Sequence, residues 1–289
     1  MTDRLDALLA HFSVTANVFH TGALCGVNEL DGGGDCGQLH LVRRGEVGVS
    51  HGGAEVLRIT RPSLLLYPLP MAHRFITDTQ NGADFACAQL RFEGGAANPI
   101  CAALPPFVCR PLDEIQGSAE ALSLLFGEAF AANCGRRAML NRLFEIVFIQ
   151  VLRQLMEQGQ TGAGMLAGLA HTKLRHALVD MHENPRLEWT LDALAERAGM
   201  SRSVFATQFR DTVGCTPGAY LQRWRVGLAQ KALRQGQSLR WIAEEVGYGS
   251  ESALSRAFKA QCGLSPREWK QAQQGHPQAS APDVQPGRS

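Results

Sequence analysis

The sequence predicts an α+β protein of two domains, an N-terminal β-barrel with helices and a C-terminal all-α domain. Three observations lead to this prediction. The chain has 289 residues, a length that suggests two domains. Residues 18–92 contain short apolar segments that alternate like strands and are separated by Gly and Pro. Residues 193–266 contain a repeated pattern of helix, tight turn and helix.

The repeat consists of two stretches with the same layout. They read AGMSRSVFATQFRDTVGCTP at 198–217 and GYGSESALSRAFKAQCGLSP at 247–266. Each stretch has a turn glycine followed by Phe, Gly and Pro, and the spacing from Phe to Pro is the same in both. The segments ALAERAG and WIAEEVG precede the two turns, so the match extends upstream. An internal repeat of this kind indicates two copies of one structural unit.

Each copy is expected to form a helix-turn-helix unit, in which the second helix fits the major groove of DNA. Gly199 and Gly247 can adopt the left-handed conformation that ends a helix. In the first copy we expect Val204, Phe205 and Phe209 to be buried. The residues expected to face DNA are Ser201, Arg202, Ser203, Thr207 and Arg210 in the first copy, and Ser250, Glu251, Ser252, Ser255, Arg256 and Lys259 in the second.

A single helix is expected to connect the two copies. Residues 217–236 begin with Pro217, a typical first helical residue, and end at Gly236. One face of this helix is apolar and consists of Leu221, Trp224, Leu228, Ala232 and Leu233. A rigid connector would hold the two recognition helices about one turn of DNA apart.

The region from about 168 to 272 resembles the DNA-binding domain of AraC-type (AraC/XylS) transcriptional regulators. The stretch LRWIAEEVGYGSESALSRAFKAQCGLSPREWK at 239–270 carries most of this resemblance. The resemblance implies that the first recognition helix reads one major groove and the second reads the next. Ala206 departs from the pattern, because a longer polar residue could read a base whereas Ala can only meet a thymine methyl group. The first helix is therefore expected to be the weaker reader.

Charge is distributed in agreement with DNA binding by one domain only. Residues 166–272 contain 15 Lys and Arg against 10 Asp and Glu, whereas residues 1–165 contain 12 against 16. A basic domain beside a mildly acidic one suits binding to a polyanion by the basic part.

The N-terminal strands predict a small barrel or jelly roll. Segments such as GQLHLVRRGEVGVS and LLLYPLPMAHRF resemble half of a cupin domain. Metal-binding cupins usually present two closely spaced His residues, an acid and a third His. This chain has His40 and His73, but position 42 is Val42. The two His residues are weak candidates for metal ligands, and we expect no metal and no other cofactor.

Eight cysteines are scattered along the chain without a C-x-x-C pair, as expected for thiols in a reducing cell. The N-terminal half resembles a cupin-containing subgroup of AraC-type regulators that sense reactive chlorine through cysteines. The matching positions are Cys87 and, more loosely, Cys25. If Cys87 forms a thiolate, a nearby cation from His73, Arg74 or Arg91 could lower its pKa. The alternatives are a structural Cys87 and a small apolar or aromatic effector inside the barrel.

Residues 118–158 are expected to form two helices broken at Cys134 and Gly135. The apolar stripe of the second helix could pack on the barrel or form a dimer interface. The predicted domain boundaries are 1–110 for the cupin-like sensor domain, 111–158 for a helical connector or dimerisation region, 159–168 for a flexible linker, 169–272 for the DNA-binding domain and 273–289 for a disordered tail.

These features predict a cytoplasmic transcriptional regulator that is not an enzyme. The chain has no apolar run long enough to cross a membrane and no secretion signal, and no catalytic motif is found. The expected partners are double-stranded DNA at a promoter or operator, RNA polymerase, a small-molecule effector or an oxidant, and a second copy in a homodimer. Two alternatives remain: a cupin metalloenzyme fused to a DNA-binding domain, and a DNA-repair regulator that is alkylated at a cysteine.

Overall fold

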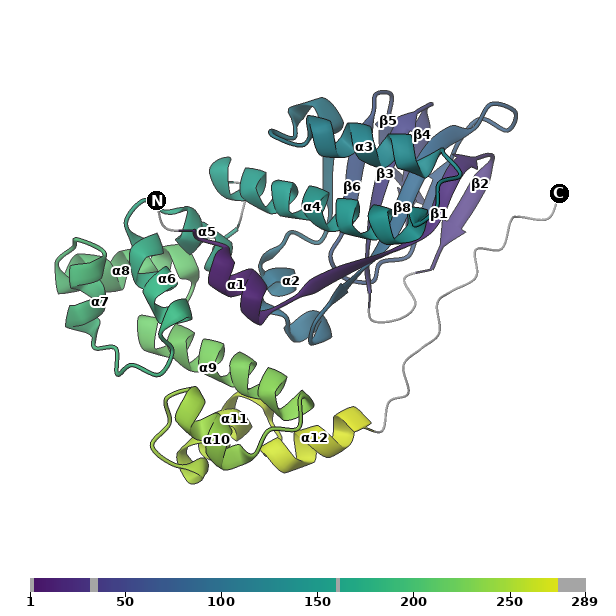
Figure 1. Cartoon of the computed structure of the whole chain (residues 1–289). Coiled ribbons are helices and arrows are strands. Elements are labelled where there is room, and N and C mark those ends of the chain that lie inside the picture. The colour runs from purple at the N-terminus through teal and green to yellow at the C-terminus, as the bar shows by residue number, and fades with distance from the viewer. Residues whose placement is uncertain (1–2, 32–35, 160–161, 275–289) are drawn as a thin grey trace. The chain divides into compact units, whose positions relative to one another are not determined.

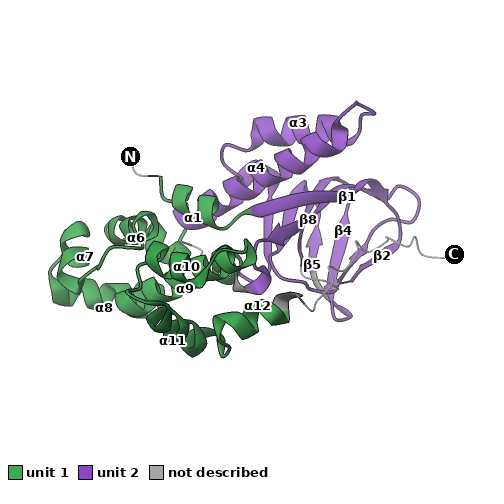
Figure 2. Cartoon of the chain, turned by 60° about the horizontal axis from the view of Figure 1, so that its bottom comes forward, with its two compact units in different colours: residues 1–13, 97–103, 159–279 green, residues 14–96, 104–158, 280–289 purple. Residues whose placement is uncertain are grey.

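The computed structural model describes residues 3–31, 36–159 and 162–274. The chain divides into two compact units (Figure 2). One unit contains residues 14–96 and 104–158. The other contains, of the described residues, 3–13 and 97–103 together with 159 and 162–274. Residues 1–13 and 97–103, which the sequence assigns to the sensor domain, are thus grouped with the C-terminal helices.

The first unit is built on two antiparallel sheets (Figure 1). One sheet has the strand order β1-β8-β3-β6-β9 and the other the order β2-β7-β4-β5. The strands in the described residues are β1 Val14–Leu24, β2 Val27–Leu30, β3 Gly37–Arg44, β4 Val47–His51, β5 Ala54–Ile59, β6 Ser63–Tyr67, β7 His73–Ile76, β8 Ala83–Phe92 and β9 Val108–Pro111. The predicted cupin-like β architecture is confirmed.

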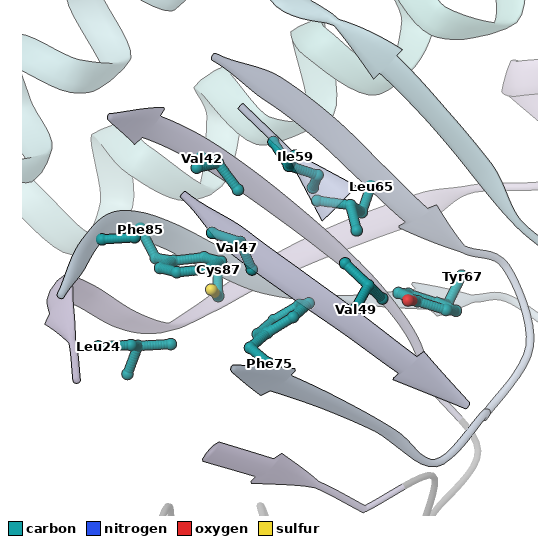
Figure 3. Close-up of a cluster of buried hydrophobic side chains, with 11 residues drawn as sticks. Leu24, Val42, Val47, Val49, Ile59, Leu65, Tyr67, Phe75, Phe85 and Cys87 are labelled. Carbon is teal, nitrogen blue, oxygen red and sulfur yellow. The ribbon is translucent and has the colours of Figure 1, made fainter. Parts of the chain in front are cut away.

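An apolar core holds the barrel together (Figure 3). Its buried side chains come from strands of both sheets, among them Val49, Leu65, Phe75 and Phe85. The predicted turn at Gly45 joins β3 to β4, and this glycine has a φ of +95°. A Cβ atom at this position would lie only 2.7 Å from Ala83, so both the backbone conformation and the close packing require glycine.

Two helices belong to the same unit: α4 (Arg136–Glu157) packs on strand β1 of the five-stranded sheet, and α3 (Ala119–Ala129) packs on α4. Strand β1 lies at the edge of this sheet, so that β8 pairs with it on one side and no described strand pairs with its outer side. Side chains of α4 replace a neighbouring strand there: Glu145 accepts a hydrogen bond from the Ala16 amide at 3.1 Å, and Asn141 accepts one from the Val18 amide at 2.9 Å. This helix therefore protects an edge that could otherwise pair with another chain.

The apolar stripe of α4 is part of the core and is not a free surface. Its residues Leu140, Leu143, Phe144, Val147, Val151, Leu152 and Leu155 are all buried within the single chain. Phe148 meets Phe92 of β8 edge to face at 5.7 Å. Of the two possibilities left open by the sequence, packing on the barrel is the one observed for this stripe.

The second unit is helical. Its helices are α1 Asp6–His11, α2 Pro99–Ala103, α5 Met165–Ala170, α6 Leu174–Glu183, α7 Leu191–Arg197, α8 Arg202–Val213, α9 Pro217–Arg234, α10 Leu239–Glu245, α11 Glu251–Cys262 and α12 Pro266–Gln274. Of two short 3-10 turns, Leu112–Glu114 belongs to the barrel unit, and Gly95–Ala97 lies where the chain passes from the barrel unit to the helical one. Helix α5 begins inside the predicted linker 159–168. Most of the predicted disordered tail 273–289 falls outside the described residues.

The N-terminal segment packs on the connecting helix α9. The Phe12 ring meets the Trp224 ring at 5.0 Å, and Phe12 is 3% exposed. The Lys231 ammonium donates to the backbone oxygens of Ala10 at 3.2 Å and His11 at 2.8 Å, which lie at the C-terminal end of α1. A cation at that end of a helix is favourable.

Candidate DNA interface and sensor core

The first helix-turn-helix unit consists of α7 and α8. The Thr190 hydroxyl accepts a hydrogen bond from the Ala193 amide at 3.1 Å and so caps the start of α7. The turn passes through Gly199, which has a φ of +60°. Helix α8 is anchored by Phe205 and Phe209, both fully buried, and Phe209 meets Tyr220 of α9 at 5.8 Å.

The second helix-turn-helix unit, α10 and α11, repeats this construction. Gly247 has a φ of +82°, and its missing side chain leaves room for the backbone of Arg186, 2.7 Å from where a Cβ would lie. Phe258 meets Trp269 at 5.8 Å, as Phe209 meets Tyr220 in the first unit. Ser250 is the N-cap residue of α11, and its hydroxyl accepts a hydrogen bond from the Ala253 amide at 3.1 Å.

Helix α9 connects the two helix-turn-helix units as predicted. It begins with Pro217, and the five residues of its predicted apolar face are buried. The chain turns at Gly236, with a φ of +83°, before the second unit starts.

The predicted DNA-facing residues are mostly exposed. Ser201, Arg202, Ser203, Thr207, Arg210, Ser250, Glu251, Ser252, Arg256 and Lys259 are exposed, and Ser255 is half-buried. Two of them have local partners: the Ser250 hydroxyl caps its own helix, and Arg202 Nη1 lies 3.3 Å from Asp192 Oδ2 on α7.

The prediction that Val204 is buried is wrong. Its side chain is 48% exposed on α8, whereas Phe205 beside it is fully buried. The helix rotates by about 100° per residue, so Phe205, Phe209 and Val213 form the inner face and Val204 lies outside it. Gln208, which the sequence did not single out, is also exposed and lies one turn after Val204. Residues four apart lie on the same face of a helix, so an exposed Val204 would have indicated an exposed Gln208.

Inside the barrel, five residues form a row across the five-stranded sheet. The register pairs His20 with Cys87, Cys87 with His40, His40 with Leu65, and Leu65 with Cys109. Directly paired residues of neighbouring strands point to the same face of a sheet. Because Leu65 and Cys87 belong to the apolar core, this row faces the barrel interior.

His40 also contacts His73, which comes from the other sheet. Their Nε2 atoms lie 3.1 Å apart, and His40 Nε2 is 3.1 Å from Gln38 Oε1. The His73 ring stacks on Tyr67 at 4.1 Å. Burial lowers the pKa of His40 well below its usual value and that of His73 to about 4. Across the described residues, no group of three His, Cys, Asp or Glu side chains is placed to hold a metal ion.

The two candidate redox cysteines lie in different environments. Cys87 is 1% exposed and belongs to the same buried cluster as Phe75 and Phe85 (Figure 3). Burial raises the pKa of the Cys87 thiol far above its usual value. Its neighbours in the row, His20 and His40, have lowered pKa values and so carry no charge that could stabilise a thiolate.

Cys25 is exposed and follows the end of β1. The register places Cys25 five residues beyond His20, the partner of Cys87, which corresponds to roughly 16 Å along the strand. A disulfide requires Cα atoms within about 7 Å, so Cys25 and Cys87 cannot join directly in this arrangement. The redox role of both thiols stays a prediction.

No helix among the described residues has the length and apolar character needed to cross a membrane.

Comparison with known proteins agrees with both halves of this description. A family model described as Cupin matches residues 3–157, and one described as a helix-turn-helix domain matches residues 194–272. An AraC-like transcription regulator of Streptomyces lividans is 39% identical over 171 residues, which are 58% of this chain and 56% of that protein. The chain thus spans little more than half the length of this relative.

Two further similarities concern most of the chain and its C-terminal part. The RCS-specific HTH-type transcriptional activator RclR of Escherichia coli K12 is 29% identical over 236 residues, covering 80% of this chain and 83% of RclR. The DNA-binding domain of AdpA, solved in complex with a target DNA, is 31% identical over 35% of this chain and 93% of that chain, with a TM-score of 0.34.

The fold and the site define a cupin barrel joined to a paired helix-turn-helix domain. The chain belongs to the cupin family, and it is one of the AraC-type proteins that carry an N-terminal cupin domain. Its named relatives are transcription regulators, which does not favour the metalloenzyme or the DNA-repair alternative.

Proposed function

We propose that this protein is a transcriptional regulator that binds a bipartite site on double-stranded DNA through α8 and α11. The observation that carries the proposal is the duplicated helix-turn-helix unit, in which matching anchors hold two recognition helices with polar side chains exposed. Phe209 with Tyr220 and Phe258 with Trp269 are the two anchor pairs. The positive charge of residues 166–272 supports binding to the phosphate backbone.

The two recognition helices differ in the chemistry they offer to DNA. Helix α11 exposes Arg256 and Lys259, and no ion pair joins Arg256 to another described residue. An Arg can bind the O6 and N7 atoms of guanine through two hydrogen bonds. In contrast, Arg202 of α8 is paired with Asp192. We therefore assign the stronger share of base recognition to α11.

The cupin barrel is the proposed signal-receiving domain. Its signal would change DNA binding by shifting the population between two states of the protein, for example through dimerisation or through the relation between the two units. A homodimer has a candidate surface in the exposed apolar residues Leu124, Met139 and Ile146 of α3 and α4. We also propose that the protein contacts RNA polymerase when it is bound at a promoter.

The test is binding of the purified, reduced full chain to the DNA upstream of its own gene, with a parallel sample treated with a mild dose of hypochlorous acid. Specific binding that competitor DNA of random sequence does not remove supports the proposal. An affinity change that a thiol reductant reverses would support a cysteine signal. If site selection from random DNA also yields no preferred sequence, the proposed function is wrong.

A further inference from the structure

The first two turns of α8 carry methyl-bearing side chains, and at two of these positions α11 carries Ser and Arg. Ser203, Val204 and Thr207 are exposed in this part, and Ala206 is half-buried. Val204, Ala206 and Thr207 carry methyl groups. The repeat has an offset of 49 residues, since Phe209 corresponds to Phe258. Ala206 and Thr207 therefore occupy the positions of Ser255 and Arg256 in the second unit.

The cation at the start of α8 is already engaged. Arg202 Nη1 lies 3.3 Å from Asp192 Oδ2, within the same helix-turn-helix unit. The next cation of the helix, Arg210, comes two turns later, whereas the N-terminal residues of a recognition helix are those that contact base edges. Apart from Arg202 and Gln208, the exposed side chains of the first two turns of α8 consequently carry small hydroxyl and methyl groups.

Such a surface matches one feature of the major groove. Thymine is the base that presents a methyl group there, at C5, and Ala, Thr and other apolar side chains contact it. Val204, at 48% exposed, adds the largest exposed apolar surface of this part of the helix. Gln208 lies one turn beyond Val204, and Gln can bind adenine, the partner of thymine, through two hydrogen bonds.

On the basis of the proposed function, we infer that α8 recognises thymine methyl groups, so that its half-site is rich in A·T pairs. Helix α11 reads the other half-site through Arg256. The two halves of the binding site thus differ in the chemistry that is read: methyl contacts in one and hydrogen bonds to guanine in the other. Val204, Ala206 and Thr207 are the specificity-determining residues of the first half.

Deoxyuridine tests this inference because it pairs like thymidine but lacks the C5 methyl group. The preferred site of the full chain is first selected from random DNA, and Arg256→Ala identifies the half-site of α11 as the one whose base preference it relaxes. Thymidines are then replaced by deoxyuridine in each half separately. Burying one methyl group is worth about a three- to fourfold change in an equilibrium constant. We expect at least a threefold rise in Kd for each contacted thymidine in the α8 half.

Two variants link this loss to α8. Thr207→Ser removes a methyl group and keeps the hydroxyl, and Val204→Ala shortens an exposed side chain. The loss on deoxyuridine substitution should shrink at the contacted positions in these variants. Ser252→Ala on α11 is the matched control and should leave the loss unchanged. Circular dichroism checks that the variants remain folded, as expected for exposed positions.

The outcomes separate this inference from the proposed function. If the chain binds a preferred site and deoxyuridine in the α8 half has no effect, or if its effect is the same in all variants, α8 does not read thymine methyl groups and the inference is overturned. If no preferred site exists, the proposed function itself fails.

Discussion

His40 Nε2 and His73 Nε2 lie 3.1 Å apart inside the barrel, although the two residues come from different sheets. His73 Nδ1 is 2.8 Å from the backbone oxygen of Met71, which can only accept a hydrogen bond. The proton of neutral His73 therefore sits on Nδ1, and its Nε2 must accept from His40. The contact excludes two protonated rings, which would turn donor against donor, and burial favours the neutral form of each ring by lowering both pKa values.

Neutral burial of these rings predicts that the barrel is destabilised by acid. Their pKa values in the folded protein lie below the usual 6.5, to about 4 for His73. The unfolded chain therefore binds more protons between about pH 6.5 and pH 4, so stability is complete above about pH 6.5 and falls as the pH is lowered. Hydrogen exchange of β3 and β7 peptides at pH 7.5 and pH 5 measures this change.

A variant tests whether the pair is responsible. His73→Phe keeps a ring next to Tyr67 and removes one titrating group. In this variant the barrel should take up about one proton fewer on unfolding, so its stability, measured by exchange, should depend less on pH. An equal pH dependence in the variant and the natural protein would contradict the assignment. His182, which burial holds at a pKa of about 3, lies in the helical unit and does not affect the barrel peptides.

Arg256→Ala should weaken specific DNA binding by about 1–3 kcal/mol if Arg256 pairs with a guanine. The exposed side chain has no described ion-pair partner, so its removal should leave the fold intact. Kd measured for the preferred site and for each single-base variant would then show relaxed preference at one position. A loss that is equal for all sequences, with a shallower dependence on salt, would instead indicate a phosphate contact.

Arg202→Ala is the matched comparison in the first helix-turn-helix unit. Because Arg202 must first leave its surface ion pair with Asp192 to reach a base, its loss should cost less specific affinity than that of Arg256. A loss as large as that of Arg256→Ala would show that the ion pair opens on DNA.

The helix-turn-helix units could be predicted from the sequence because their determinants are local. Turn glycines, N-cap residues and the Phe-to-Pro spacing all lie within twenty residues, and the periodicity of α9 identified its buried face. Val204 could not be placed correctly, because periodicity shows that a residue is apolar but not whether a neighbouring helix covers it. The core position of the α4 stripe likewise depends on which surface meets it.

For the N-terminal half, the sequence predicted the β-barrel architecture but not which residues meet inside the barrel. Alternating strands indicated a cupin-like barrel, whereas the row of His20, Cys87 and His40 results from strand register between residues far apart in the chain. The sequence left open whether a cation from His73, Arg74 or Arg91 lowers the pKa of the Cys87 thiol or whether Cys87 is structural. The structure shows the opposite direction, since neutral rings and burial surround the sulfur.

The contrast between Cys25 and Cys87 predicts selective alkylation. Iodoacetamide reacts with thiolates, so in the native reduced protein it should label exposed Cys25 and spare Cys87 until urea unfolds the barrel. Peptide mass spectrometry with and without urea measures both sites. Rapid native labelling of Cys87 would mean that the barrel opens readily, and it would favour a direct redox role.

Cysteine variants connect this chemistry to DNA binding. If oxidation of Cys87 is the signal, Cys87→Ala should abolish the change in DNA affinity caused by hypochlorous acid, and Cys25→Ala serves as the comparison. An unchanged response in Cys87→Ala rules out Cys87 as the sensor.

The packing of Phe12 on Trp224 predicts that the N-terminal segment stabilises the DNA-binding unit. Gly227 of α9 makes room for the ring, because a Cβ atom there would lie 3.2 Å from Phe12 Cζ. Removing a buried Phe side chain costs about 3–5 kcal/mol, so Phe12→Ala should lower the free energy of unfolding of the helical unit by about 3 kcal/mol. All four tryptophans of the chain lie beyond residue 159, so tryptophan fluorescence in urea reports on this unit.

Lys231→Met is the companion variant. It keeps an apolar stem and removes the ammonium that binds the oxygens of Ala10 and His11, so it should cost less than Phe12→Ala, about 1 kcal/mol. If Phe12→Ala leaves the fluorescence transition unchanged, residues 1–13 do not contribute to the stability of the helical unit in solution. A shift in that transition, with hydrogen exchange of the barrel strands unaltered, would show that the segment stabilises the DNA-binding helices although it precedes the barrel in sequence.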